Sequence, residues 1–133
     1  MSLEPEDIPF VNDLVDTPET RPYWDACNEG RLLLTRCRDT GRVFAYPRGV
    51  SPFTLSGNVE WFEASGRGRV YACSVVSHAK GPYVIAYVTL EEGVTVLTGL
   101  VGAGAEPPRI GQAVKVVFRE TASGQKVPFF TPA

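Results

Sequence analysis

Apolar runs bounded by glycine and proline fill the second half of the chain and predict β-strands. These runs are rich in valine, isoleucine, tyrosine and threonine, which suit a pleated, half-buried surface. We expect strands at residues 66–78, 83–90, 94–100, 113–119 and 126–131. The second and third strands are separated only by Glu91-Glu92-Gly93, a linker in which Gly93 can adopt the positive φ of a tight hairpin. Five strands are enough to curl into a small, partly open barrel.

The segment upstream of these strands predicts a short helix from Thr20 to Gly30. Thr20 can cap its start, Pro22 is tolerated in the first turn, and Gly30 suits a left-handed stop. Three side chains share one face of this helix, namely Tyr23, Trp24 and Cys27. A helix of about two turns is not stable alone, so this face must dock either on the protein's own core or on a second chain. Residues 1–16 have no sustained period and predict an extended arm, either a loose terminus or an arm that lies on a partner.

A polar turn around Gly41 separates two short apolar runs and predicts a small hairpin with strands at 31–37 and 43–46. A rigid, turn-prone segment at residues 47–54 follows and leads into a run at 59–64. This hairpin with a second turn has the outline of a zinc ribbon. We expect apolar packing to keep it folded, through Leu32, Leu34, Phe44, Phe53 and Leu55.

The zinc ligands of such a ribbon are missing from this sequence. A structural zinc site needs four thiolate or imidazole ligands, usually in two pairs with short gaps. Cys37 has Thr40 where its pair member would stand, and the second turn offers only Ser51 and Thr54. One thiol cannot hold zinc, and hydroxyls are poor substitutes for thiolates. We therefore predict that the chain binds no zinc.

The composition narrows the class of protein. A net charge of −2 gives no general attraction to a polyanion, which weighs against nucleic acid as the main partner. A hydrophobic share of 44% is enough for a packed core. No apolar run reaches the roughly 18–20 residues of a membrane span, and the acidic start is unlike a secretory signal, so a cytoplasmic location is the default expectation.

The 3 cysteines are an odd number, which fits reduced thiols better than a disulfide framework. Cys27 on the helix face and Cys73 in a strand are expected to be buried and inert. Cys37 is flanked by Arg36 and Arg38, whose charges could lower the pKa of its thiol.

Short motifs along almost the whole chain resemble a known family. Their order is more specific than any one of them: Pro22-Tyr23-Trp24, Glu29-Gly30-Arg31-Leu32, Arg36-Cys37-Arg38-Asp39-Thr40-Gly41, Tyr46-Pro47-Arg48, Glu60-Trp61, Gly66-Arg67-Gly68-Arg69-Val70-Tyr71, Pro82-Tyr83-Val84-Ile85-Ala86 and Ile110-Gly111-Gln112-Ala113-Val114. The chain resembles the acyl-CoA-associated zinc-ribbon plus OB-fold proteins, the family of domain of unknown function thirty-five. The family pattern has cysteines at the positions of Cys37, Thr40, Ser51 and Thr54, so this ribbon resembles a degenerate one.

The resemblance implies a mainly β fold, in which an N-terminal helix and a rubredoxin-like zinc-ribbon remnant precede a five-stranded OB-fold barrel. It divides the chain into an N-terminal arm and helix (1–30), a degenerate ribbon (31–58) and the barrel (59–133). It also implies a small subunit without chemistry of its own, paired in a hetero-oligomer with a thiolase-like enzyme. Enzymes of this kind include thiolases, condensing enzymes and retro-aldolases that shorten steroid or aromatic side chains.

In such a complex the barrel would help to form the channel for a coenzyme A thioester, a shared substrate and not a tightly bound cofactor. The nucleophile and the acid–base groups would belong to the partner, so we expect no catalytic residue here. The expected ligand-binding residues are His78, Lys80, Pro82 and Tyr83 at the channel rim, and Arg48 for the phosphates of coenzyme A. The expected partner contacts are Tyr23, Trp24 and Arg42.

Two other functions stay open. An OB barrel can bind single-stranded nucleic acid by stacking bases on tyrosines, here Tyr71, Tyr83 and Tyr87, although core packing or channel lining explains these residues equally well. An autonomous hydrolase or thioesterase would use His78, the only histidine. No carboxylate or nucleophile stands at a recognisable spacing from it.

Overall fold

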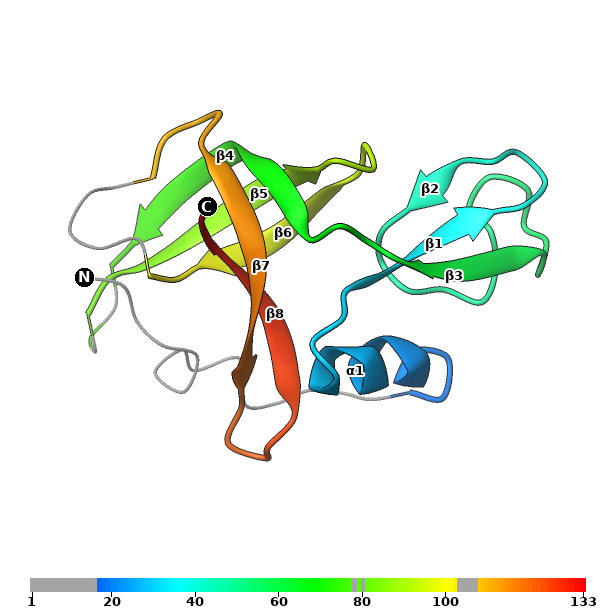
Figure 1. Cartoon of the computed structure of the whole chain (residues 1–133), viewed down its shortest axis with the longest axis horizontal. Coiled ribbons are helices and arrows are strands. Elements are labelled where there is room, and N and C mark those ends of the chain that lie inside the picture. Colours follow the sequence, from blue (N-terminus) through cyan, green and yellow to red (C-terminus); the bar gives the residue numbers. More distant parts are fainter. Residues whose placement is uncertain (1–16, 78, 80, 103–107) are drawn as a thin grey trace.

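The chain folds into one helix and eight strands in a computed structural model that describes residues 17–77, 79, 81–102 and 108–133. Within these residues the strands form a three-stranded sheet and a closed five-stranded barrel (Figure 1). The elements are α1 (Arg21–Asn28), β1 (Leu33–Cys37), β2 (Val43–Phe44), β3 (Val59–Glu63), β4 (Arg67–Val76), β5 (Tyr83–Leu90), β6 (Thr95–Leu100), β7 (Ala113–Glu120) and β8 (Lys126–Pro132). The mainly β fold predicted from the sequence is confirmed.

The ends of α1 follow the sequence signals with one exception. Pro22 stands in the first turn, where backbone N–H groups have no intrahelical partner. Gly30 has a φ of 77°, and the N–H groups of the two residues after the C-cap donate back to carbonyls of the last turn. The predicted Thr20 side-chain cap is wrong, because the Thr20 hydroxyl donates to the Thr17 carbonyl oxygen at 3.2 Å instead.

The ribbon is a small antiparallel sheet with the strand order β2-β1-β3. The turn between β1 and β2 has Gly41 at a φ of 73°, as its sequence predicts. All of β1 pairs with β3, which begins at Val59. The barrel was expected to begin at that residue, yet the hydrogen bonds of β3 belong to the ribbon sheet and the first barrel strand is β4.

The barrel has the strand order β4-β5-β6-β8-β7. The predicted hairpin between β5 and β6 turns at Gly93, whose φ is 93°. The pairing of β4 with β5 shifts register between Val70 and Ala72, a bulge of the kind that bends a strand around a small barrel. β6 and β8 run parallel and meet at one pair, Leu100 and Phe130, so this is the weakest seam of the barrel.

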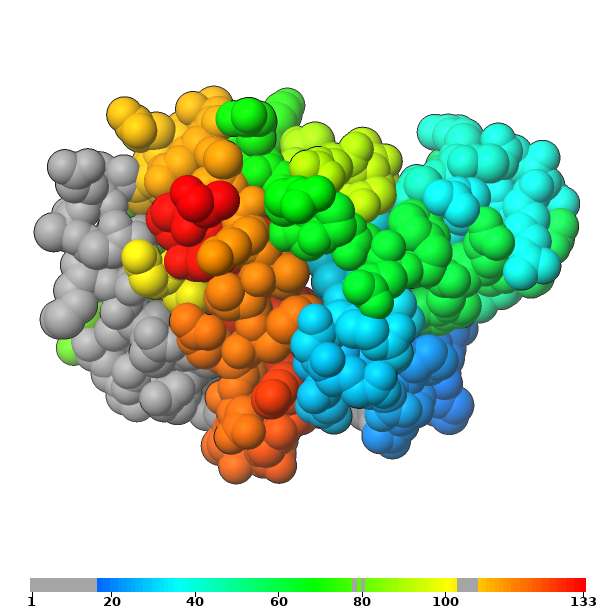
Figure 2. Space-filling view, viewed as in Figure 1, coloured from blue at the N-terminus to red at the C-terminus, as the bar shows by residue number. Residues whose placement is uncertain are grey.

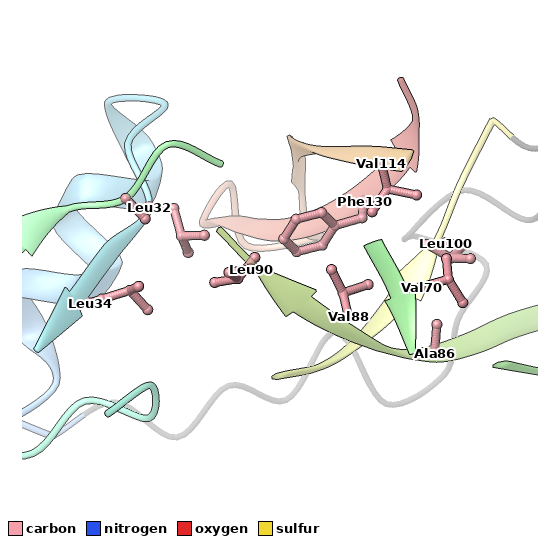
Figure 3. Packing of buried hydrophobic residues seen from close by; sticks show 10 residues of the cluster. Leu32, Leu34, Val70, Ala86, Val88, Leu90, Leu100, Val114 and Phe130 are labelled. Carbon is pink, nitrogen blue, oxygen red and sulfur yellow. The ribbon is translucent and has the colours of Figure 1, made fainter. Parts of the chain in front are cut away.

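One apolar core fills the barrel and continues into the ribbon. Its buried members are Leu32, Leu34, Ala64, Val70, Ala86, Val88, Leu90, Leu100, Val114 and Phe130. Figure 3 shows Leu90 between the ribbon side chains, Leu32 and Leu34, and the barrel side chains, Val88 and Phe130. The ribbon and the barrel therefore share a core.

The packing predicted for the ribbon is confirmed for Leu32, Leu34 and Phe44, which are buried. The prediction is wrong for Leu55, which is 81% exposed. Leu55 lies at the tip of the second turn with a φ of 61°, and its N–H donates to the Ser51 carbonyl at 2.9 Å, so its side chain points away from the core.

The ribbon forms a lobe at one end of the molecule, cyan to green in Figure 2, with α1 in blue below it and the barrel beside it. Within the described part of the chain, no helix is long and apolar enough to cross a membrane. Cys27 and Cys37 are fully buried free thiols, whereas Cys73 is only half-buried.

Candidate functional site

An apolar cavity of about 460 Å³ lies where α1 and the loop after β2 meet the barrel. Cavities of a few hundred cubic ångströms are the usual size of small-molecule sites. The walls are Tyr23 and Trp24 of α1, Tyr46 and Pro47 of the loop, residues 83–85 of β5, 97–99 of β6 and 127–129 of β8. Segments about 100 residues apart in the sequence thus share one site.

The cavity stands over the seam at which the barrel closes. Residues 97–99 and 127–129 precede the single pair that joins β6 to β8, and they line the cavity instead of pairing with each other. The Tyr46 hydroxyl accepts a hydrogen bond from the Leu97 backbone N–H at 3.0 Å. This bond satisfies a donor on the strand edge and holds the loop over the cavity.

A second apolar cluster on the outside of the barrel supports the wall. Val127 and Phe129 of β8 are buried there together with Val101, while Trp24 and Tyr83 pack against them. β8 therefore contributes to the core on one face and to the cavity on the other.

Polar bonds fix α1 against the start of β8. Asn28 Oδ1 accepts the Lys126 backbone N–H at 2.9 Å. The Gln125 side-chain amide nitrogen lies 3.1 Å from both Asn28 Oδ1 and the Trp24 carbonyl oxygen. These bonds hold the Tyr23 and Trp24 wall in place relative to the barrel.

The cavity has the chemistry of a binding site. None of its described lining residues carries a charged side chain. Burial raises the pKa of Tyr23 above its ordinary value of 10.0, so the phenol is neutral at physiological pH. A wall of this kind favours an uncharged, apolar group, because a charge would lose its hydration there without gaining a partner.

The structure gathers three of the predicted site residues in this cavity. Tyr83, predicted at the channel rim, lies in the wall, and Pro82 is exposed directly before it. Tyr23 and Trp24, predicted as partner contacts, lie in the same wall with their rings edge to face at 4.8 Å. Their helix face docks on the protein's own barrel.

The other predicted residues lie elsewhere. Arg48 is exposed and follows Pro47 of the cavity wall. Arg42 lies on the ribbon, where its guanidinium stacks over the Phe53 ring at 3.8 Å, and it does not line the cavity. His78 and Lys80 fall outside the described residues.

Sequence reasoning missed Tyr46, Leu97 and the β8 part of the wall. One signal was available in β5, which is apolar on both faces. Ile85 and Tyr87 are exposed and alternate with the buried core residues Ala86 and Val88. A strand that is apolar on both faces indicates a second apolar surface outside the barrel.

The expected zinc-ligand positions meet at the tip of the ribbon. Hydrogen bonds from the Ser51 and Thr40 side chains lower the pKa of the Cys37 thiol to about 7. The two flanking arginines pair with Glu60, at 2.8 and 3.5 Å, instead of facing the sulfur. No group of three or more His, Cys, Asp or Glu side chains in the described residues is placed to hold a metal ion.

Comparison with known proteins finds relatives for both parts of the chain. Residues 24–50 match the family model described as ChsH2, rubredoxin-like zinc ribbon domain, and residues 61–119 match ChsH2, C-terminal OB-fold domain. A DUF35 domain-containing scaffold protein of Methanocaldococcus jannaschii is 36% identical over 95 residues, which cover 66% of this chain and 67% of the relative. The chain belongs to the DUF35 family. The family resemblance and the OB-fold barrel inferred from the sequence are confirmed.

Other relatives extend the DUF35 match. A DUF35 domain-containing scaffold protein of Pyrococcus furiosus is 32% identical over 105 residues, 74% of this chain and 76% of that protein. The "Probable enoyl-CoA hydratase alpha subunit" of Thermomonospora curvata is 31% identical over 116 residues, 84% of this chain. This DUF35 chain spans only 36% of the length of that subunit.

Two solved structures share the fold of this DUF35 chain. One, described as an Ltp2-ChsH2(DUF35) aldolase, superposes with a TM-score of 0.79 at 28% identity and covers 90% of this chain and 98% of its counterpart. A DUF35 protein of unknown function from Sulfolobus solfataricus superposes with a TM-score of 0.65 at 15% identity, over 87% and 86% of the two chains. The second comparison supports the fold alone.

Proposed function

We propose that this DUF35 chain is a non-catalytic accessory subunit of a thiolase-like enzyme, and that its cavity receives the acyl part of a coenzyme A thioester. The observation that carries the proposal is the uncharged apolar cavity at the barrel seam. Relatives support it, since one solved relative is described as an aldolase with a DUF35 subunit, others as scaffold proteins, and another as an enoyl-CoA hydratase subunit.

The burial of apolar surface decides which acyl groups the cavity prefers. Each methylene group moved from water into an apolar site contributes about 0.8 kcal/mol. Two additional methylenes would therefore tighten binding by about 1.6 kcal/mol, roughly fifteenfold in Kd. The described wall offers neither a charged group nor an acid–base pair, and in our proposal the bond-breaking groups belong to the partner.

The outer face of β4, β5 and β6 is the surface that we assign to the partner. Tyr71 and Tyr87 are 66% and 47% exposed there. Tyr87 pairs across the sheet with Leu97, which also lines the cavity, so this apolar face is continuous with the site. A partner seated on it would cover exposed apolar surface and bring its own active site to the cavity.

Tryptophan fluorescence tests the acyl site directly. The chain has 2 tryptophans, Trp24 in the cavity wall and Trp61 on β3, so a Trp61→Phe variant reports from the cavity alone. We expect Trp24 emission to change on addition of butyryl-CoA and hexanoyl-CoA, with a Kd roughly fifteenfold lower for the longer chain. Free coenzyme A should leave the emission unchanged.

A pair of variants tests whether acyl-CoA binds in the cavity. Leu97→Ala shortens a lining side chain and should weaken hexanoyl-CoA binding about fivefold. Ile110→Ala removes a similar side chain that is 74% exposed and does not line the cavity, so binding should not change. An equal response to free and acylated coenzyme A, or equal losses in the two variants, would contradict the acyl site.

The partner surface has its own test. Tyr87→Glu places a charge in the centre of the apolar face and should weaken the complex with the thiolase-like enzyme at least tenfold. Leu55→Glu adds the same charge at a position in the ribbon turn that is 81% exposed and lies outside β4, β5 and β6, so it should leave the complex intact. Equal affinity of the two variants for the partner would refute the assignment of this face.

A further inference from the structure

The ribbon tip keeps the layout of a zinc site without its ligands. The four side chains at the family's cysteine positions are Cys37, Thr40, Ser51 and Thr54. Cys37 Sγ lies 3.9 Å from Thr54 Oγ1, and the side chains of Ser51 and Thr40 are hydrogen-bonded to the same thiol. In a tetrahedral site with zinc–sulfur bonds of about 2.3 Å, neighbouring sulfurs are about 3.8 Å apart. Cys37 and Thr54 therefore keep the spacing of two neighbouring zinc ligands.

The chemistry of the donors does not fit zinc. A structural zinc site takes four thiolate or imidazole ligands, and this cluster offers one thiol and three neutral hydroxyls. Asp39, whose carboxylate contacts Thr54, would bring the number of strong metal ligands only to two, and no group of three or more His, Cys, Asp or Glu side chains in the described residues is placed to hold a metal ion.

Hydrogen bonds of Ser51 organise the second turn. Ser51 is fully buried, and its Oγ accepts the backbone N–H groups of Phe53 and Thr54 at 3.1 and 3.3 Å. A hydroxyl that bonds N–H groups two and three residues ahead fixes a turn without a metal.

Asp39 connects the two turns. Its carboxylate accepts a hydrogen bond from the Thr54 hydroxyl at 3.1 Å and another from the Asn58 side-chain amide at 2.9 Å. The backbone adds a bond from the Arg38 N–H to the Asn58 carbonyl at 3.0 Å. These bonds join the segment after β1 to the segment before β3, which is the cross-link that a ribbon metal supplies.

We infer that a metal-free hydrogen-bonded cluster, formed by Cys37, Asp39, Ser51 and Thr54, replaces zinc in this ribbon. The ribbon folds without a metal ion and does not acquire one. The layout of a tetrahedral site remains, so three cysteines would restore zinc binding.

Metal analysis of the wild-type chain, expressed in zinc-supplemented medium, is the first test. The expected result is less than 0.1 zinc per chain and a melting temperature that a strong chelator does not change. One zinc per chain, or a melting temperature that falls with chelator, would overturn the inference.

Restoring the three missing cysteines tests whether the ribbon keeps the layout of a tetrahedral metal site. The variant Thr40→Cys/Ser51→Cys/Thr54→Cys, kept reduced, should bind one Co²⁺ with the intense thiolate-to-cobalt absorption of a tetrahedral four-sulfur site. Adding Cys37→Ser to this variant should weaken Co²⁺ binding at least a hundredfold, which shows that Cys37 and not Cys27 or Cys73 is the fourth ligand. A folded triple variant without that absorption would refute the retained layout.

Local hydrogen exchange tests the cluster itself. Ser51→Ala removes the acceptor of the Phe53 and Thr54 N–H groups, so their exchange should become at least tenfold faster. The barrel amide of Val88 should keep its protection, because it lies in the core of another sheet. Unchanged exchange at Phe53 and Thr54 would show that the hydroxyl does not hold the turn.

Discussion

Gly68 allows β4 to lie against β5, and its replacement gives a prediction that can be worked from distances. A Cβ atom at this position would lie 2.6 Å from the Thr89 carbonyl oxygen and 2.8 Å from Val88 Cγ1. The first of these atoms belongs to the backbone of β5, which is paired on both sides in the barrel and cannot move away without breaking hydrogen bonds. β4 is paired on both sides as well, with β5 and β7, so a shift of either strand disturbs hydrogen bonds.

Gly68→Ala should therefore lower the free energy of unfolding by about 2–3 kcal/mol, the upper part of the range for overpacked sites. For a chain of 133 residues this corresponds to a melting temperature about 10 °C lower. Thermal unfolding followed by circular dichroism, with urea unfolding as a second measurement, gives both quantities.

Gly57→Ala is the matched control. Its added Cβ would have only the Gly49 carbonyl oxygen near it, at 3.9 Å, and its φ is not positive. The loss of glycine flexibility in the unfolded chain should make this variant neutral or slightly more stable. Equal melting temperatures for Gly68→Ala and wild type would refute the steric account of this strand pair.

Three further predictions concern the helix, alkaline pH and nucleic acid. Asn28→Ala removes the acceptor of the Lys126 N–H, so urea unfolding should show a loss of about 1–2 kcal/mol; no loss would mean that the bond does not anchor α1. Burial raises the pKa of Cys27 from 9.0 to about 12, and that of Tyr23 above 10.0. Above pH 9 the unfolded chain therefore releases protons that the folded chain keeps, and the free energy of unfolding should fall with pH by up to about 1.4 kcal/mol per unit for each group. A Cys27→Ala variant should show a shallower fall between pH 9 and 11, and an identical slope would contradict the assignment. Single-stranded oligonucleotides should not be retained at low salt, and tight, salt-sensitive binding would favour the nucleic-acid function instead.

The elements of the fold could be predicted because their signals are local. Gly30, Gly41 and Gly93 stand at the positive φ angles that their positions require. Thr20 fits a cap by residue type, but a competing acceptor three residues earlier takes its hydroxyl, and sequence position does not reveal that choice. The prediction that Leu55 is buried is wrong for a similar reason. The backbone conformation of the turn, with a φ of 61° at Leu55, decides where the side chain points, and its apolar character does not.

The site could be predicted only in part. Motifs and helix spacing single out Tyr83 and the aromatic pair of α1, which line the cavity; a partner contact is the role predicted for the pair. Their meeting with residues 127–129 depends on the closure of the barrel at one residue pair, Leu100 and Phe130. No local pattern encodes a contact across that distance in the chain. The ribbon, in contrast, could be identified because its turns persist although three of the four expected cysteines are absent.

The central claim is that this DUF35 chain works as the accessory subunit of a thiolase-like enzyme. Its most direct test is purification of the tagged full chain from its native cells at low and high salt, with mass spectrometry and a measured stoichiometry. The account predicts a thiolase-like protein in a fixed ratio to this chain, and a loss of that protein with the Tyr87→Glu variant but not with Leu55→Glu. Recovery of the chain alone at every salt concentration would contradict the account.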